Sequence, residues 1–152
     1  MNTQTRHEEG ELQDTIEREV HINAPVKRVW ALVTQAEHLG IWFADAGAEI
    51  DLRPGGVLKL TWQEQGTAEG RVERVEEPTL FAFRWRSSGP YDEADSTLVE
   101  FKLSAAEDGT LVRVVETGFA ALADGEQRHA DHTEGWSIEL GHLVEHAEGA
   151  GA

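Results

Sequence analysis

Glu116 is the residue whose type and position most suggest chemistry in this 152-residue chain. It continues an alternating segment in which Val112 and Val114 share its phase. Because side chains at i, i+2 and i+4 of a strand face the same side, Glu116 is predicted to point inward with the two valines. A buried carboxylate is costly unless it is paired or protonated, so it would serve as a polar anchor or an acid/base group. The alternative is that the strand ends earlier and leaves Glu116 in solvent or bonded to backbone N–H groups near Gly118.

Histidines form the second group of candidates. His142 and His146 are four residues apart, which places them on one helix face, where two imidazoles could hold a metal. The zinc-protease motif needs a Glu directly after the first His, but Leu143 follows here. A solvated helix face is therefore the simpler interpretation, and we predict no metal site. Three more polar residues lie upstream, near the start of the same predicted helix: His129, Asp131 and His132.

Two further polar residues have competing interpretations. Thr97 shares the inner phase of its strand and could offer a hydroxyl, although an ordinary strand-end threonine is the preferred interpretation. Tyr91, the single tyrosine, lies in an acidic loop and either gates a cavity or packs on the surface.

The chain has no cysteine, which excludes disulfides, thiolate catalysis and cysteine-based metal sites. No Ser-His-Asp arrangement, phosphate-binding loop or dinucleotide-binding glycine pattern is present, so we expect no cofactor.

The elements that must position these residues follow from the hydrophobic periodicity. Alternation predicts a strand over 15–22, and apolar residues at helical spacing predict a helix over 26–33 and a second short helix ending near Trp42 and Phe43. A period of two then predicts about six strands, near 48–52, 57–62, 67–76, 81–86, 97–103 and 111–116. Helical spacing returns in a long helix that begins between Gly125 and Asp131 and ends near Glu148. Its apolar stripe is Trp136, Leu140, Leu143 and Ala147.

This order of elements predicts an α+β fold with a curved antiparallel sheet of about six to seven strands wrapped around the long C-terminal helix. A long sheet covered by one long helix must curl around it, and aromatic side chains then line the space between them. Trp30 is expected in the core, and Trp42 and Phe43 are expected near the cavity entrance. Two glycines inside the predicted helix, Gly135 and Gly141, indicate either a close approach to the sheet or an adjustable helix.

Composition narrows the class of protein. The net charge is −16, from 13 Lys and Arg against 29 Asp and Glu. Such a surface repels phosphate backbones and anionic membranes, so neither nucleic acid nor membrane is an expected partner. Residues 1–11 are polar and acidic, unlike a secretory signal, and no apolar run approaches the ~20 residues of a membrane span. We therefore expect one cytoplasmic domain over 15–147, with flexible tails at 1–14 and 148–152.

Several short motifs occur in a characteristic order between residues 16 and 147. They are Ala24-Pro25-x-x-x-Val29-Trp30, Leu39-x-x-Trp42-Phe43, Asp51-Leu52-Arg53-Pro54-Gly55-Gly56, Phe81-x-Phe83-x-Trp85, Gly109-Thr110, Gly118-Phe119 and Gly135-Trp136. They resemble the START-like, helix-grip superfamily often called SRPBCC, and within it the activator of heat-shock-protein-90 ATPase homologue 1-like family. The resemblance implies a deep apolar cavity between sheet and helix and no single activity. Chaperone-activating members use a second domain, which this sequence lacks, so contact with a chaperone is not expected.

These observations lead to a small-molecule binding protein whose apolar cavity takes a lipid-like, aromatic or polyketide-like ligand. One alternative is a cyclase or dehydratase that uses Glu116 as its acid/base group, which a hydrogen bond from Glu116 to a second titratable group would favour. Another is a chaperone cofactor or other protein-interaction module, and a homodimer is possible. The predicted ligand-binding residues are Trp62, Phe81, Phe83, Trp85, Val99, Phe101, Val114, Glu116, Trp136, Leu140 and Leu143.

Overall fold

Seven strands form one antiparallel sheet in the computed structural model, which describes residues 14–86 and 89–150. The spatial order of the strands is β1-β7-β6-β5-β4-β3-β2. Consecutive strands from β2 to β7 are therefore neighbours, and β1 closes the sheet by pairing with β7. The strands are β1 (Thr15–Ile22), β2 (Ala48–Ile50), β3 (Val57–Trp62), β4 (Gly66–Glu76), β5 (Leu80–Arg86), β6 (Thr97–Ala106) and β7 (Gly109–Thr117).

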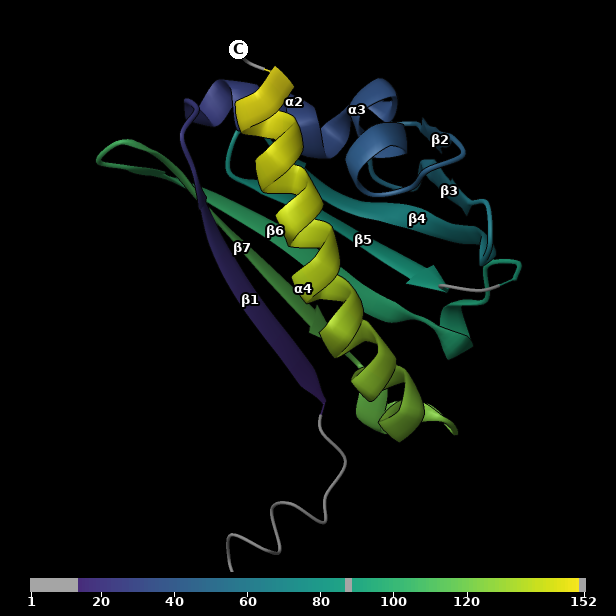
Figure 1. The fold of residues 1–152 in the computed structure, drawn as a ribbon. Coiled ribbons are helices and arrows are strands. Elements are labelled where there is room, and N and C mark those ends of the chain that lie inside the picture. The colour runs from purple at the N-terminus through teal and green to yellow at the C-terminus, as the bar shows by residue number, and fades with distance from the viewer. Residues whose placement is uncertain (1–13, 87–88, 151–152) are drawn as a thin grey trace, which may run out of the picture.

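Three helices lie against this sheet (Figure 1). The long helix α4 (Gly125–Ala150) crosses one face, while α2 (Val26–Thr34) and α3 (Ala36–Trp42) lie together at one end. Two short 3-10 turns, η1 (Glu93–Asp95) and η2 (Phe119–Ala121), precede β6 and α4. The arrangement confirms the predicted α+β helix-grip fold, including the two short helices after the first strand.

Strand parity determines which side chains face α4. In β6, Val99, Phe101 and Leu103 are buried while the alternate residues are more exposed. In the register of β6 with β7, Phe101 lies opposite Val114 and Val99 lies opposite Glu116. The buried face of one strand therefore continues across the next, and Glu116 belongs to that face, as its phase predicted.

Glycines allow two of the close approaches in this fold. A Cβ at Gly125 would lie 1.8 Å from the carbonyl oxygen of Phe119, so only glycine lets α4 begin directly after η2. A Cβ at Gly56 would lie 2.0 Å from the carbonyl oxygen of Asp51, which explains the glycine in the turn before β3. Gly135 and Gly141 are different, because a Cβ at either would meet nothing within 4 Å. The close approach to the sheet considered for these two helix glycines is therefore absent.

The described part of the chain begins at residue 14 and ends at residue 150. Of the predicted N-terminal tail, residues 1–13 lie outside the described part of the chain. The helix α4 continues to Ala150, beyond residue 147, and the backbone N–H of Asn23 donates to Glu148 at 3.1 Å. Residues 151–152 of the predicted C-terminal tail lie outside the described part. Among the described residues, no helix is long and apolar enough to cross a membrane.

Candidate functional site

A buried carboxylate, that of Glu116, lies at the centre of the candidate site. The residue is 0% exposed, and four side chains converge on its two oxygens. The indole N–H of Trp136 donates to Oε1 at 2.7 Å, and that of Trp85 donates to Oε2 at 2.9 Å. The hydroxyl of Thr97 also donates to Oε2, at 2.5 Å. Nδ1 of His132 lies 3.0 Å from Oε1 and 2.9 Å from Oε2.

The fold brings these residues together from four elements. Trp85 and Thr97 are paired across β5 and β6, and Glu116 is in the adjacent strand β7. His132 and Trp136 lie one turn apart on the face of α4 that covers these strands, because residues four apart in a helix share a face. The sheet therefore supplies the carboxylate and two donors, and the helix supplies the other two.

The surroundings of Glu116 keep it ionised. Burial on its own would raise the pKa of this carboxyl group, because a charge is poorly solvated inside a protein. The hydrogen bond and the positive charge available from His132 lower the pKa of Glu116, and the hydrogen bonds from Thr97 and Trp85 lower it further. The net result is a pKa of Glu116 below its ordinary value of 4.5. Glu116 is thus a charged acceptor enclosed by donors, not a protonated acid facing a ligand.

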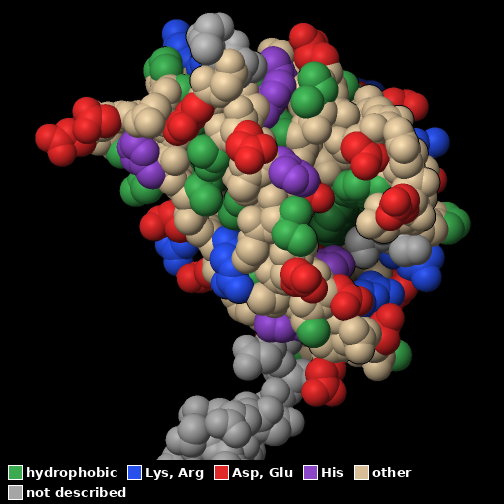
Figure 2. Space-filling model, viewed as in Figure 1, with side chains coloured by type: hydrophobic (Ala, Val, Ile, Leu, Met, Phe, Trp, Pro, Cys, Tyr) green, Lys and Arg blue, Asp and Glu red, His purple; other side chains and the backbone are tan. Residues whose placement is uncertain are grey.

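A cavity of about 530 Å³ adjoins this carboxylate. Its apolar wall consists of four aromatic side chains, Phe43, Trp62, Trp85 and Trp136. The Phe43 ring is the common neighbour: its centroid lies 5.3 Å from that of Trp136, 5.5 Å from that of Trp85 and 5.6 Å from that of Trp62. Figure 2 shows hydrophobic side chains recessed in a hollow that charged side chains surround. The other lining residues are Gln65, Arg86, Asp124, Arg128, Asp131, His132, Gly135 and Glu139.

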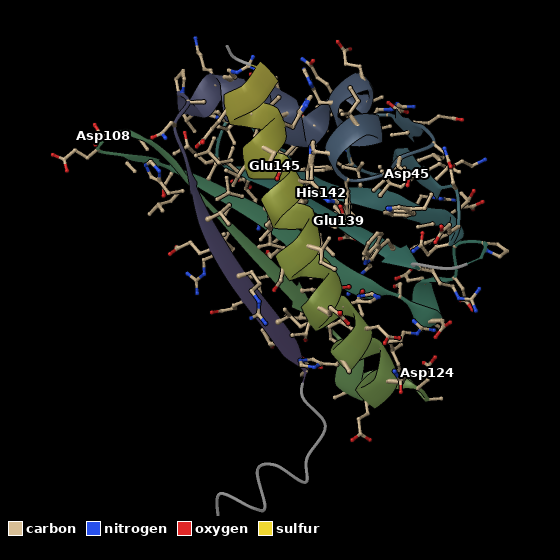
Figure 3. All side chains as sticks on the ribbon, viewed as in Figure 1. Asp45, Asp108, Asp124, Glu139, His142 and Glu145 are labelled. Atoms are coloured by element: carbon tan, nitrogen blue, oxygen red, sulfur yellow. The ribbon has the colours of Figure 1, made fainter. Side chains whose placement is uncertain are left out.

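Two arginines at the edge of the cavity share one carboxylate. Arg128 donates to both oxygens of Asp95 at 2.7 Å, and Arg86 donates to Oδ2 at 2.7 Å. These bonds hold the pKa of Asp95 below its usual value. Arg128 also donates to Asp124, the residue just before α4 that is labelled in Figure 3. The ion pairs fix η1 against α4 and leave the cavity edge with both signs of charge.

Glu139 lines the cavity farther along α4. Burial, together with the negative charge of Asp45, raises the pKa of Glu139 above its usual value, although a hydrogen bond with His142 works in the opposite direction. Figure 3 shows Glu139 and His142 on the part of α4 that faces the segment of Asp45. A neighbouring hollow of about 470 Å³ is also lined by Glu139 and by Trp42, which was expected near an entrance.

The predicted ligand-binding residues fall into three groups. Trp62, Trp85 and Trp136 line the 530 Å³ cavity, and Phe43 lies beside them at its wall. Glu116 lies directly behind Trp85, Trp136 and His132. The remaining residues are not among the lining residues of this cavity and pack in the buried core, as does Trp30. They are Phe81, Phe83, Val99, Phe101, Val114, Leu140 and Leu143.

The other candidates have structural partners. Tyr91 lies with its ring centroid 4.8 Å from the guanidinium carbon of Arg71 and is not among the cavity-lining residues. His142 bonds to Glu139 at 3.2 Å, and His146 lies 3.0 Å from His38. No group of three or more metal-binding side chains occurs in the described ranges 14–86 and 89–150.

His132 is the site residue whose role sequence reasoning missed. The predicted apolar stripe of α4 began at Trp136, and His132 lies one turn before it on the same face. Extending that stripe backward by four residues would have placed an imidazole beside the inward-facing Glu116.

A sheet that grips one long C-terminal helix, with an aromatic cavity at the helix, defines a domain of the SRPBCC, or START-like, class, a class of small-molecule binding folds. More specifically, the chain belongs to the Activator of Hsp90 ATPase homolog 1-like protein family, whose family model matches residues 23–148. A search of the curated proteins found no match.

Solved structures of similar fold come from several bacteria. Protein BH1534 from Bacillus halodurans is 26% identical, with a TM-score of 0.70 over 89% of this chain and 97% of that one. CalU16 from Micromonospora echinospora is 29% identical, with a TM-score of 0.65 over 85% of this chain and 73% of that one. DynU16, described as a putative protein in the dynemicin biosynthetic locus, is 21% identical, with a TM-score of 0.76 over 90% of this chain and 48% of that one.

Proposed function

We propose that this protein binds a planar aromatic or polyketide-like small molecule in the 530 Å³ cavity beside Glu116. The observation that carries the proposal is the aromatic wall of Phe43, Trp62, Trp85 and Trp136. Flat π-surfaces stack on such a wall, and burial of apolar area contributes about 25 cal/mol per Å² before the costs of association. The cavity volume lies within the range of small-molecule sites, on the order of 300–1,000 Å³.

The edge of the cavity narrows the ligand class further. Arg86 and Arg128 are neutralised by Asp95 and Asp124, while Asp131 and Glu139 add negative charge. A ligand with a free carboxylate would meet a net acidic edge on a strongly acidic protein. A neutral ring system with polar substituents fits this edge better than a fatty acid, so the aromatic class is favoured over the lipid-like one.

Tryptophan fluorescence tests the proposal, because three of the five tryptophans line the cavity. Titration with a panel of neutral polycyclic aromatic compounds and with fatty acids should give saturable quenching by members of the first group. Gly135 lines the cavity and has open space around it, so Gly135→Leu should fill the cavity and abolish quenching. Gly141→Leu is the matched control, since Gly141 is an exposed glycine of the same helix that is not among the lining residues. Equal binding by wild type and Gly135→Leu would contradict the proposal that the ligand binds in this cavity.

An enzyme of the acid/base class is the second candidate function, because a specific contact favours it. Glu116 faces inward and bonds to a second titratable group, His132, at 2.9 Å. Glu116 itself is enclosed by its donors, so a ligand in the cavity would meet the imidazole and not the carboxylate.

A further inference from the structure

We propose that the cavity selects a ligand whose planar ring system carries a protonated amine, and that Glu139 recognises this ammonium group. This role of Glu139 rests on the proposed function, because it specifies the polar substituent of the ligand that the 530 Å³ cavity would take. Glu139 is then a binding residue that determines specificity, and it takes no part in a reaction.

Glu139 lies where the two hollows of the molecule adjoin. It lines both the 530 Å³ cavity and the neighbouring hollow of about 470 Å³, which also share Phe43 and Trp62. Gly135 lies one helical turn before Glu139, and a Cβ at Gly135 would meet nothing within 4 Å. The missing side chain leaves open space beside the carboxylate. A ring system that stacks on the aromatic wall can therefore place a substituent against Glu139.

The carboxylate of Glu139 is largely buried, yet no fixed positive charge of the protein accompanies it. Its side chain is 19% exposed, and its ion-pair partner is His142, whose side chain is 53% exposed and whose Nδ1 lies 3.2 Å from Oε1. The indole of Trp62 is a further hydrogen-bonding partner. Within residues 14–86 and 89–150, no lysine or arginine forms an ion pair with Glu139. Burial and the charge of Asp45 raise the pKa of Glu139, and an ammonium group of the ligand would oppose both effects.

The positive groups that line the cavity are already paired inside the protein. Arg128 donates to both oxygens of Asp95, and Arg86 donates to Oδ2 of the same residue. An anionic ligand would have to compete with Asp95 for these guanidinium groups. An ammonium group would instead meet Glu139, a carboxylate that no arginine holds. The charges of the cavity therefore favour a cationic substituent over an anionic one.

The neighbouring hollow strengthens the same preference. Asp45 and Glu64 line it together with Glu139, and its described lining residues include no lysine or arginine. Phe43 and Trp62 line it as well, and the faces of aromatic rings attract cations. An amine that reaches past Glu139 into this hollow would meet negative charge and aromatic rings, and a carboxylate would be repelled by both.

The test compares three anthracene derivatives that share one ring system and differ in the charge of one substituent. They are anthracenemethylamine, anthracenemethanol and anthracenecarboxylate. Each compound is titrated at neutral pH, and tryptophan quenching measures its binding. Wild-type protein should bind the amine most tightly and the carboxylate most weakly. Added salt should weaken binding of the amine but not binding of the alcohol, because it screens only the charged contact.

A change at Glu139 separates the local contact from the general negative charge of the protein. Glu139→Gln should weaken binding of the amine about tenfold and leave binding of the alcohol unchanged, because only the amine uses the charge. Unchanged binding of the alcohol also shows that this variant is folded. Glu145→Gln is the matched control, since it removes the same charge from an exposed position of α4 that lines neither hollow. It should bind all three compounds like wild type. Both residues are labelled in Figure 3.

Cross-linking of wild-type protein locates the amine without a variant. A water-soluble carbodiimide activates carboxyl groups, and a bound primary amine then forms an amide with the carboxyl group that it contacts. Peptide mass spectra should show the adduct of anthracenemethylamine on Glu139. Excess anthracenemethanol should suppress this adduct, because it occupies the same cavity, and should leave adducts on exposed carboxyl groups unchanged.

The outcomes separate the role of Glu139 from the proposed function. The role is overturned if the amine binds no more tightly than the alcohol, if Glu139→Gln keeps the wild-type preference, or if Glu145→Gln loses that preference equally. It is also overturned if the adduct that the alcohol suppresses lies on a different residue. In each of these cases, saturable quenching by the alcohol would leave the proposed function intact. If neither the three derivatives nor the aromatic panel quenches the tryptophans, the proposed function fails, and the role of Glu139 fails with it.

Discussion

Replacing Glu116 with glutamine should destabilise the protein by an amount that the donor geometry sets. The two indole N–H groups donate to different oxygens, Trp136 to Oε1 and Trp85 to Oε2. A glutamine amide has one oxygen and one NH₂ group, so in either orientation one indole N–H faces another donor. The hydroxyl of Thr97 can rotate and accept, but an indole nitrogen cannot. One buried donor is therefore left without an acceptor.

The size of the loss follows from these contacts. A buried donor without an acceptor costs about 1–3 kcal/mol, and each remaining bond to a neutral oxygen is weaker than one to a carboxylate by about 1 kcal/mol. The neutral amide avoids the desolvation cost of a buried charge, which offsets part of this loss. We expect a net decrease in the free energy of unfolding of about 2–3 kcal/mol for Glu116→Gln. The cost should be about 1–2 kcal/mol smaller in a Trp136→Phe background, where the NH₂ group can face the side from which the indole has been removed.

Urea unfolding followed by circular dichroism at neutral pH measures both values. Glu19→Gln, on the exposed side of β1, is the control and should stay within about 0.5 kcal/mol of wild type. Because the pKa of Glu116 is lowered in the folded state, its contribution is fully present above the ordinary value of 4.5 and is lost as the pH falls below it. The gap between wild type and Glu116→Gln should therefore narrow in acid. A variant as stable as the Glu19→Gln control at neutral pH would refute the reasoning.

Three further predictions concern other parts of the fold. Gly125→Ala should lower the free energy of unfolding by more than about 2 kcal/mol, because its Cβ would overlap the carbonyl of Phe119. Gly141→Ala should raise it by up to ~1 kcal/mol, because its Cβ would meet nothing and alanine favours the helix. Urea midpoints measure both values. Arg128→Gln removes the ion pairs that hold η1 to α4 and should cost about 1–2 kcal/mol in the same assay, and less at high salt. Burial and the nearby His38 lower the pKa of His146 from its ordinary value of 6.5, so wild type should lose stability as the pH falls below 6.5. A pH series of urea midpoints should show a smaller loss in His146→Gln.

Local periodicity was enough to predict the fold and the direction of the key carboxylate. Alternation placed Glu116 on the same side as Val112 and Val114, and all three are buried. The same argument placed Phe81, Phe83 and Trp85 on one inner face. The alternation of side chains between the two faces is a property of the strand backbone and holds for any arrangement of neighbouring strands. These predictions therefore needed no knowledge of the tertiary structure.

Strand alternation could not predict which of the inward-facing residues border the cavity. Interiors are packed densely, so a cavity forms only where the side chains of several elements fail to meet. Phe81 and Phe101 stack at 6.2 Å and fill the interior, whereas Trp85, at the end of the same strand, borders the cavity. The difference depends on how α4 crosses the sheet and on the missing side chain at Gly135, neither of which is encoded in strand parity.

The position of β1 in the sheet has a consequence for how the protein is made. This strand is synthesised first, yet its only partner among the described strands is β7, whose residues 109–117 follow nearly a hundred positions later. Each strand from β3 to β7 can pair with the strand synthesised just before it. In contrast, β1, with its buried Ile16 and Ile22, cannot pair until β7 has been synthesised. Ile16 pairs across from Glu116, so docking of β1 is also what closes the sheet beside the carboxylate. On the ribosome, the Glu116–His132 contact can therefore form only after α4 has left the exit tunnel, which makes the site among the last parts of the protein to be completed.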